Sequence, residues 1–462
     1  MATSPSVDRH TFLANLRESG LLNARKLNAL AERLPGTERG KVIARALVQQ
    51  GVLTKFQAEQ LLAGRTSGFV LGQYRILDEI GKGGMGRVFK AVHHTMNRVV
   101  ALKVLAAQFV ETEKAQQLFK HEMRAVARLM HPNLVTAYDA NQIGSRFYLV
   151  MEYVDGPSLD GLVRKFGPLP VGQACEFMRQ AAEGLQYASD MGMVHRDIKP
   201  SNILVMLPGG QPRRNRCVVK ILDFGLARLV SGDDDSYESG TIITRPNMVM
   251  GTPDFVSPEQ ARNLHSVDIR ADLYSLGCTF YFLLTGRVPF PEGGTLEKLI
   301  RHTTEQPLAV EKLRPDVSPE VTGIVRKLIA KEPAARFQTP AELAAALQPF
   351  AVENAGWPPS LTLATADQEA ANRNPEDAFK TPTPGSDPEG DFQFVTVDEA
   401  SAFANTLLPD VSLTLLSGTP VLTATRAPRS ADENRRLKLA VGIAVAIVAA
   451  TIGLAALFGL LL

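Results

Sequence analysis

Residues 195–202 read HRDIKPSN and bring a carboxylate, an amine and an amide together within eight residues. Asp197 can accept a proton from a hydroxyl group, Lys199 can neutralise an anionic oxygen, and Asn202 can offer an amide oxygen to a metal ion. An aspartate two residues after a histidine is common by chance, so this stretch alone defines no reaction. A metal site built on it still requires a carboxylate.

That carboxylate follows in residues 220–227, KILDFGLA. Asp223 stands at the end of a strand-like run of apolar residues and is followed by Phe224 and Gly225. The two stretches together supply one base and two metal ligands, an amide and a carboxylate.

A glycine-rich stretch, GKGGMGRV at residues 81–88, lies between two strand-like runs. Glycines allow the backbone to bend tightly and to present N–H groups close to phosphate oxygens. Gly81, Gly83 and Gly86 share the spacing of a dinucleotide-binding turn, but such a turn should open a helix, and residues 87–92 continue as a strand. A hairpin covering phosphates is therefore the preferred interpretation, with an ordinary glycine-rich hairpin as the alternative.

After this hairpin come a lysine on a predicted strand and a glutamate on a predicted helix. VALK places Lys103 on the next predicted strand, and HEMRAVARL places Glu122 on a helix. An ammonium group near triphosphate oxygens needs a carboxylate to hold it, and Glu122 is the residue expected to do so. On their own the two residues would be interpreted as a surface ion pair.

Residues 74–350 resemble a eukaryotic-type protein kinase domain of the serine/threonine kind that also occurs in bacteria. The resemblance rests on the combination of H-R-D-x-K-x-x-N, D-F-G, the glycine-rich hairpin and the strand lysine. It implies an α+β fold of two lobes, a β-rich N-lobe and a helical C-lobe. It also implies ATP and Mg²⁺ as cofactors.

The resemblance implies catalytic and metal-binding roles. Asp197 would accept or orient the proton of the substrate hydroxyl, Lys199 would steady the γ-phosphate, and Asn202 and Asp223 would hold Mg²⁺. Phosphoryl transfer needs little more than neutralised charge and an aligned hydroxyl, and these side chains supply both.

A larger set is expected around ATP. Lys103 would contact the α- and β-phosphates and pair with Glu122. Ile80, Val88, Ala101 and Leu204 would enclose the adenine, Met151 would be the gatekeeper, and the backbone of Glu152 and Val154 would face the base. The complete set is Ile80, Gly81, Lys82, Gly83, Gly84, Met85, Gly86, Val88, Ala101, Lys103, Glu122, Met151, Glu152, Val154 and Leu204.

Two residues match the subtype of the family that phosphorylates serine and threonine. They are Lys199 and Thr252, the latter in GTPDFVSPE. We therefore expect a kinase that transfers the γ-phosphate of ATP to Ser or Thr of proteins. The alternatives are a pseudokinase scaffold, which the complete catalytic set disfavours, and a kinase fold acting on a small molecule, which Thr252 and SPE disfavour.

Three further residues resemble scaffold positions of the family. Glu259 is expected to pair with Arg336, and Asp272 is expected to anchor the loop around Asp197. Their interpretation is structural.

The segment after Asp223 carries an acidic insert, SGDDDSYESGTIITRP at residues 231–246. Arg196 precedes the catalytic aspartate, which in the family accompanies control by phosphorylation of this segment. Thr241 and Thr244 are the expected phosphate acceptors, because they stand further from the acidic run than Ser236 and Ser239 do.

The first 66 residues are predicted to form a helical module with a weak internal repeat. Gly20 aligns with Gly51 as a helix-ending glycine, and Asn23 aligns with Thr54 as the N-cap of a following helix. Two packed helical hairpins are expected, acting in regulation or docking. Because residues 1–73 carry ten Lys or Arg against five Asp or Glu, a DNA-binding helix-turn-helix is the alternative, and a solvated basic face is the commoner explanation.

Residues 351–436 are rich in Pro, Thr, Ala and acid and are predicted to be a disordered linker. Residues 439–462 contain no charge, and as a helix these 24 residues would span roughly 36 Å, more than a hydrocarbon core of about 30 Å. They are expected to be a single transmembrane helix that anchors the protein to a membrane. Arg435, Arg436 and Lys438 precede it, which places the kinase domain on the cytoplasmic side.

Composition adds little about partners beyond proteins and the membrane. The formal net charge is +2, and the three cysteines are isolated, which suits a reducing compartment. No nucleic-acid partner is expected for the kinase, and the N-terminus shows no apolar run typical of a signal peptide. Gly442, Ala446 and Ala450 form a small-residue ladder that would allow two transmembrane helices to approach closely, so a homodimer is a further expectation.

Overall fold

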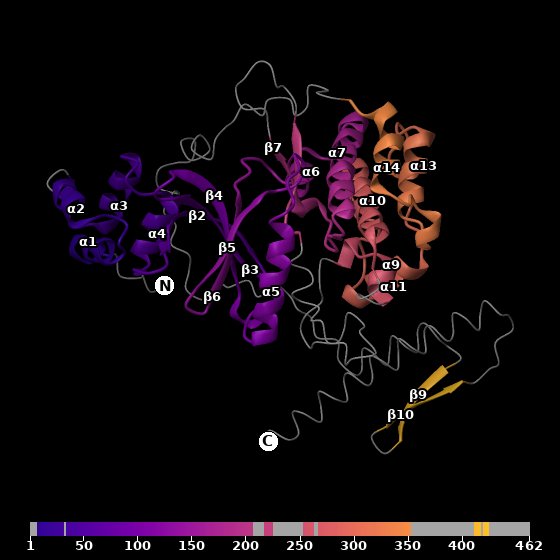
Figure 1. The fold of residues 1–462 in the computed structure, drawn as a ribbon, viewed down its shortest axis with the longest axis horizontal. Helices are drawn as coiled ribbons and strands as arrows, with labels where there is room; N and C mark the ends of the chain where they lie inside the picture. The colour runs from indigo at the N-terminus through magenta and orange to yellow at the C-terminus, as the bar shows by residue number, and fades with distance from the viewer. Residues whose placement is uncertain are drawn as a thin grey trace. The chain divides into compact units, whose positions relative to one another are not determined.

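The computed structural model describes residues 7–31, 34–206, 217–224, 253–262 and 267–352, together with two strands further along the chain (Figure 1). Contacts divide the chain into two units, the first formed by Met1–Ser239 with Met250–Pro382 and the second by Gly240–Val249 with Thr383–Leu462. In the second unit, β9 (Val411–Leu416) pairs antiparallel with β10 (Thr419–Ala424). The sequence analysis predicted no strand there. The first unit contains every other element described below.

Four helices precede the sheet and enclose a small core of their own. The core includes Phe12, Leu16, Ile43, Leu47 and Leu61, all fully buried. The helices are α1 (Arg9–Glu18), α2 (Ala24–Ala31), α3 (Gly40–Gln49) and α4 (Lys55–Leu62).

The ends of these helices follow the repeat in the sequence. Gly20 and Gly51 have φ angles of +69° and +67°, which glycine adopts without strain. Asn23 Oδ1 accepts a hydrogen bond from Lys26 N at 2.8 Å, and Thr54 Oγ1 accepts one from Gln57 N at 3.2 Å. The predicted left-handed glycines and N-caps are therefore confirmed.

A six-stranded sheet follows, in the order β1-β2-β3-β4-β6-β5. Its two faces are separated by the alternation of side chains along each strand. On β4, Ala101 and Leu105 join the main core, whereas Val100 and Leu102 join a cluster on the outer face. The strands are β1 (Val70–Leu71), β2 (Tyr74–Gly83), β3 (Gly86–His93), β4 (Arg98–Leu105), β5 (Ala137–Ile143) and β6 (Arg146–Glu152).

One long helix, α5 (Glu113–Val126), lies against the sheet (Figure 1). Thr112 caps its N-terminus by accepting from Ala115 N. Phe119 on α5 meets Phe147 on β6 edge to face, with ring centroids 5.4 Å apart. The helix thereby brings Glu122 to the inner side of the sheet.

The rest of the first unit is mainly helical. Along α7, one face is buried and includes Ala174, Phe177, Ala181 and Leu185. The helices are α6 (Leu159–Phe166), α7 (Val171–Asp190), α9 (Pro258–Arg262), α10 (Ile269–Thr285), α11 (Thr295–Thr304), α12 (Val310–Leu313), α13 (Pro319–Leu328) and α14 (Pro340–Leu347), with a hairpin of β7 (Ile203–Met206) and β8 (Val218–Ile221). The predicted β-rich part followed by a helical part is confirmed.

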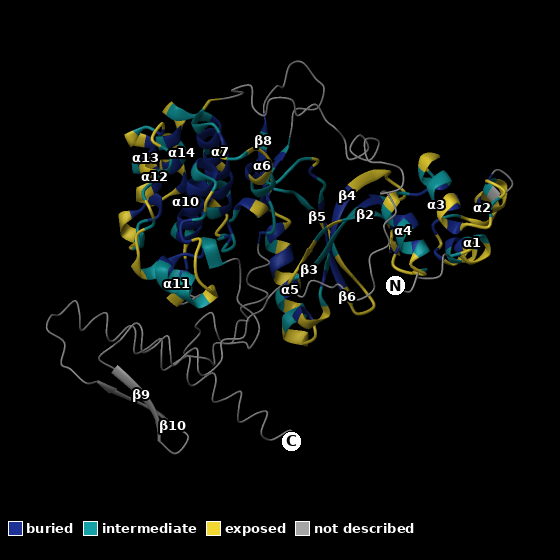
Figure 2. Ribbon diagram, turned by 180° about the vertical axis from the view of Figure 1, so that it is seen from behind, coloured by how far each residue is buried: buried dark blue, intermediate teal, exposed yellow. Residues whose placement is uncertain are grey.

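Helix α10 is the centre of this helical part. Every residue from Ala271 to Leu284 is buried, and Figure 2 shows α7 and α10 largely in dark blue. A helix that is apolar on all sides must be surrounded by protein. It packs against α13 at Gly277, where an added Cβ would lie 2.5 Å from Leu328 Cβ.

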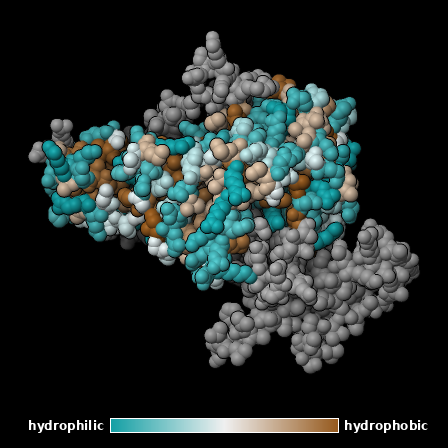
Figure 3. Space-filling view, viewed as in Figure 1, coloured by the Kyte–Doolittle hydropathy of each residue, from teal (hydrophilic) through white to brown (hydrophobic). Residues whose placement is uncertain are grey.

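On the face shown in Figure 3, the described residues are mostly polar, and the apolar ones form separate small patches. Among the residues described, no helix has the length and apolar character needed to cross a membrane. The predicted transmembrane segment 439–462 and nearly all of the predicted linker lie outside those residues.

We expect Gly277→Ala to destabilise the helical part by about 1–3 kcal/mol, because the new methyl group overpacks the contact between α10 and α13. Gly323→Ala is the matched control, since an added Cβ at this site on α13 meets nothing within 4 Å. Alanine there should stabilise the helix by about 0.5–1 kcal/mol. Chemical denaturation of both variants measures the difference, and equal stability would contradict the described packing.

Candidate active site

The loop 195–202 is held by one buried carboxylate. Asp272, on α10, is 1% exposed and accepts hydrogen bonds from His195 N and Arg196 N, each at 2.7 Å. Burial raises the pKa of Asp272, and the hydrogen bonds from the N–H groups of His195 and Arg196 act in the opposite direction. The predicted anchoring role of Asp272 is confirmed.

Presenting two consecutive N–H groups to one carboxylate requires an unusual backbone. Arg196 has a φ of +68°, in the left-handed region that non-glycine residues rarely adopt. Gln260 Nε2 donates to Arg196 O at 2.7 Å and supports this conformation from α9. The sequence analysis did not identify Gln260, because nothing local to SPEQ links it to the loop.

His195 connects the loop to the residues that follow β8 and lead into Asp223. Its Nδ1 accepts from Asp197 N at 3.1 Å, and its Nε2 lies 2.6 Å from Leu222 O. These partners assign the proton to Nε2. Phe224 packs edge to face on the imidazole at 4.6 Å, so one buried ring sets the position of both acidic residues of the site.

The side chains of the loop form a connected group. Lys199 Nζ lies 3.0 Å from Asp197 Oδ2, and Asn202 Nδ2 donates to Asp197 Oδ2 at 3.0 Å and to Asp197 O at 2.9 Å. The amide nitrogen of Asn202 is thus engaged, and within the described part of the chain no hydrogen bond reaches its Oδ1. That oxygen is available to a metal ion.

Lys103 and Asp223 form an ion pair across the site. Lys103 Nζ lies 2.8 Å from Asp223 Oδ2, and the two side chains are 7% and 25% exposed. Asp223 has a φ of +62°, so its backbone is held in the left-handed region. Glu122 is 3% exposed on α5, and its pairing with Lys103 stays a prediction.

The glycine-rich turn joins β2 and β3. Gly86 has a φ of +144°, and an added Cβ would lie 2.1 Å from Val104 O, so no side chain fits there. At Gly83 and Gly84 an added Cβ would meet nothing within 4 Å. The packing of this chain therefore does not require glycine at residues 83 and 84.

The residues expected around adenine come from five strands (β2, β3, β4, β6 and β7) and from the chain after β6. Ala101 and Met151 pair directly across β4 and β6, and Val88 pairs with Lys103. Of the other residues expected around ATP, one is buried, Val154. Three are half-buried: Leu204, Met85 and Gly81. Four are exposed: Ile80, Lys82, Gly83 and Gly84. The structure thus gathers Lys103, Val88 and Ala101 on one side of the sheet with Asp223.

A second ion pair was not predicted. Lys220 Nζ lies 2.9 Å from Glu152 Oε2 and donates to Leu134 O at 3.3 Å, and Lys220 is 7% exposed. Glu152 stands 68 residues earlier in the chain, so no spacing rule could have connected the two.

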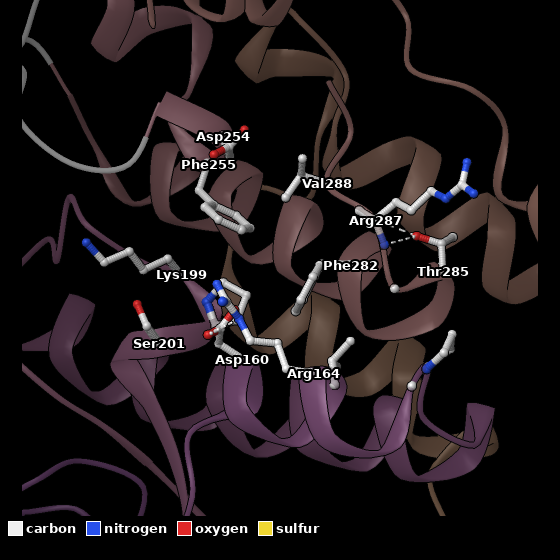
Figure 4. Close-up of a pocket in the computed structure, with 15 residues that line it drawn as sticks. Asp160, Arg164, Lys199, Ser201, Asp254, Phe255, Phe282, Thr285, Arg287 and Val288 are labelled. Atoms are coloured by element: carbon white, nitrogen blue, oxygen red, sulfur yellow. Dashed lines mark hydrogen bonds and ion pairs between the residues drawn. The ribbon is translucent and has the colours of Figure 1, made fainter. Parts of the chain in front are cut away.

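A cavity of about 540 Å³ opens beside Lys199. Figure 4 shows Lys199 and Ser201 facing it from the loop 195–202, with Asp160 and Arg164 from α6. Its apolar lining includes Phe255, Phe282 and Val288. The sequence analysis did not predict this cavity.

The scaffold pair predicted from the sequence is present. Arg336 Nη1 and Nη2 donate to Glu259 Oε1 and Oε2 at 2.6 and 2.8 Å, and Arg336 is 2% exposed. Four of the residues singled out in the sequence lie outside the described residues, and their roles stay predictions: Thr241, Thr244, Thr252 and Gly225.

Comparison with known proteins identifies the class to which this fold and site belong. Residues 74–347 match the protein kinase domain family, and the chain belongs to that family. It is 37% identical over 268 residues to the serine/threonine-protein kinase pkn3 of Myxococcus xanthus, covering 57% of this chain and 47% of that protein. It is 36% identical over 279 residues to the serine/threonine-protein kinase PknB of Mycobacterium leprae, covering 60% of this chain and 42% of that protein.

The chain spans about half the length of these relatives. A solved structure, the PknI kinase domain of Mycobacterium tuberculosis, is 25% identical and covers 62% of this chain and 98% of that one, with a TM-score of 0.46.

We expect Asp272→Asn to loosen the loop 195–202, because the amide group would turn a donor toward one of the two N–H groups. Leaving a buried N–H unsatisfied costs about 1–3 kcal/mol. Hydrogen exchange followed by mass spectrometry should show faster exchange in peptides covering residues 193–206.

Asp268→Asn is the control for this substitution. Asp268 caps the same helix by accepting from Arg270 N at 2.9 Å, and asparagine caps equally well. Its exchange pattern should match the wild type. Unchanged exchange in Asp272→Asn would contradict the anchoring role.

Proposed function

We propose that the protein transfers the γ-phosphate of ATP to serine and threonine hydroxyl groups of proteins. The observation that carries the proposal is the bonded group of Asp197, Lys199 and Asn202, fixed by Asp272 and connected through His195 to the backbone of Leu222, which precedes Asp223. Relatives named serine/threonine-protein kinases support the same activity.

The residues present fit ATP. Gly83 and Gly84 leave open space where side chains would otherwise stand, and Lys103 provides a cation, 6% exposed, on the strand beneath them. Triphosphate oxygens would receive backbone N–H groups from the turn and the ammonium group of Lys103. Ala101, Met151 and Val154 offer buried apolar surface to the adenine.

The donor set also fits Mg²⁺, which prefers one or two carboxylates completed by phosphate oxygens and water. Asp223 supplies the carboxylate and Asn202 Oδ1 the amide oxygen. No cluster of three or more His, Cys, Asp or Glu able to hold a metal ion occurs in the described parts of the chain. When bound, Mg²⁺ would neutralise charge on the phosphate oxygens.

Asp197 and Lys199 are placed for the transfer itself. The Asp197 carboxylate would orient the acceptor hydroxyl and take its proton, while Lys199, 3.0 Å away, would offset negative charge on the transferred group. The cavity beside Lys199 provides room for a polypeptide that presents the hydroxyl. Its lining carries both acidic and basic side chains, which suits a peptide better than an apolar small molecule.

The pseudokinase alternative is disfavoured by this geometry. A scaffold that only binds nucleotide has no need of a base held by Lys199 and Asn202. Selection of Ser and Thr over Tyr rests on Lys199 and on the sequence position of Thr252.

We expect Asp197→Asn to lower phosphate transfer to a generic basic protein by about 10²–10⁴-fold, because the base is lost while the shape is kept. Labelled ATP and purified full-length protein in detergent give the measurement. Asp190→Asn, at an exposed position on α7, is the control and should leave the rate unchanged. Equal labelling by wild type and Asp197→Asn, or label found on tyrosine, would contradict the proposal.

We also propose that residues 439–462 anchor the protein in a membrane with the kinase domain on the cytoplasmic side. The support is the uncharged sequence and the cluster of Arg435, Arg436 and Lys438 before it. Two such helices could pack along Gly442, Ala446 and Ala450, giving a homodimer.

Deletion of residues 439–462 should move the protein from the membrane fraction to the supernatant after a high-salt wash. The matched control removes residues 355–378, an equal length of the predicted linker, and should stay with the membrane. If the protein lacking residues 439–462 still sediments with membranes, the anchor lies elsewhere.

A further inference from the structure

Strand β2, which leads into the glycine-rich turn, contains an irregularity near its start. In its pairing with β3, Ile76 faces Ala91 and Asp78 faces Lys90, so Leu77 is an extra residue. A bulge of this kind interrupts the ladder, bends the strand and increases its twist. The carbonyl groups at the bulge must find partners outside the ladder.

Those partners come from helix α4 of the N-terminal module. Thr54 Oγ1 donates to Leu77 O at 2.5 Å, and Gln57 Nε2 donates to Ile76 O at 2.6 Å. Ile76 N in turn donates to Phe69 O at 2.8 Å. Both backbone groups of Ile76 are therefore bonded to residues that precede the sheet.

The same two side chains are fixed by each other. Gln57 Oε1 accepts from Thr54 N at 3.0 Å, and Thr54 Oγ1 accepts from Gln57 N, which forms a capping box. Because Gln57 Oε1 is engaged, its Nε2 must point at Ile76 O. Gln57 is only 3% exposed, so this contact excludes water.

Apolar contacts reinforce the junction. Phe56 on α4 packs against Phe89 on β3, with ring centroids 6.5 Å apart, and both border the outer-face cluster of the sheet. Phe69, 3% exposed, joins the core of the four helices. The N-terminal module thus packs directly against the β2–β3 hairpin and is not joined to it by the chain alone.

The hairpin held in this way carries the residues expected to cover ATP. Ile80 and Gly81 follow the bulge on β2 within four residues, and Val88 stands opposite Gly81 on β3. At the far end the turn is secured by Ala106 N, which donates to Met85 O at 3.0 Å. A second irregularity, at Ile80 between Glu79 and Gly81, lies closer to the turn. The bend at Leu77 therefore contributes to the direction in which the hairpin and its turn extend.

We propose that the N-terminal helical module positions the glycine-rich turn for nucleotide binding, with Thr54 and Gln57 as positioning residues. The proposal rests on the proposed kinase function. Loss of either donor frees the bulge, and the turn then samples positions that do not cover the phosphates. Nucleotide affinity falls, while the rate at saturating ATP is kept because Asp197 and Lys199 are held by α10.

Three substitutions of Thr54 separate helix capping from the contact with β2. Thr54→Ser keeps both the acceptor and the donor. Thr54→Asp keeps an acceptor for the helix but has no proton to donate to Leu77 O. Thr54→Val loses both. Gln57→Met removes the amide at similar length.

Asn23→Ala is the control within the module. It removes the N-cap of α2, which should weaken the module without touching the sheet. The KM for ATP, the kcat and the Kd for ADP are measured on the full chain, with thermal unfolding as a check on folding.

The KM for ATP and the Kd for ADP should rise about tenfold in Thr54→Asp, Thr54→Val and Gln57→Met, with kcat within about twofold of the wild type. Thr54→Ser and Asn23→Ala should keep wild-type values. The proposal is overturned if Thr54→Asp and Gln57→Met bind ADP as the wild type does, or if Asn23→Ala weakens binding equally. A wild type that binds ADP but transfers no phosphate would instead contradict the proposed function.

Discussion

The geometry of the active site depends on the burial of one carboxylate. Asp272 lies inside α10, where every neighbouring residue is buried, and a carboxylate in such a place is tolerated only when it is fully hydrogen-bonded. The N–H groups of His195 and Arg196 meet that need. The dependence is mutual, because Arg196 keeps its left-handed backbone only while the carboxylate accepts both bonds. The loop that carries Asp197 is therefore fixed by the core of the helical part and needs no ligand to form.

From that anchor the constraint reaches the nucleotide side of the site. His195 bonds to the backbone of Asp197 on one side and of Leu222 on the other, so the segment after β8 that carries Asp223 is connected to the loop. Asp223 then meets Lys103 at 2.8 Å. In this structure the two opposite charges neutralise one another, although each would face phosphate or metal in the complex. Their pairing lowers the free-energy cost of burying both charges in a partly buried site. When ATP and Mg²⁺ bind, the phosphate oxygens would take the place of the Asp223 carboxylate beside Lys103. Mg²⁺ would take the place of the Lys103 ammonium group beside Asp223.

The residues that could be predicted from the sequence are those whose chemistry is fixed at short spacing. Asp197, Lys199 and Asn202 lie within one loop, and an anchor such as Asp272 was found because the family resemblance covers it. Contacts between distant segments left no such signal. Lys220 meets Glu152 across 68 residues, and either residue could be an ordinary surface charge. The fold class followed from the family resemblance, whereas the β9–β10 hairpin lies in a region whose composition predicted none.

The boundary of the family match does not coincide with the boundary of the structural unit. The match begins at residue 74, yet the carbonyl groups of Ile76 and Leu77 are bonded to Gln57 and Thr54. A bulged strand at that point needs donors that the matched residues do not give it, and the preceding helices provide them. The helical repeat at the N-terminus suggested a regulatory or docking module, and the excess of basic residues suggested a DNA-binding helix-turn-helix as the alternative. The buried amide of Gln57 donates to Ile76 O, so α4 is in direct contact with the first long strand of the sheet.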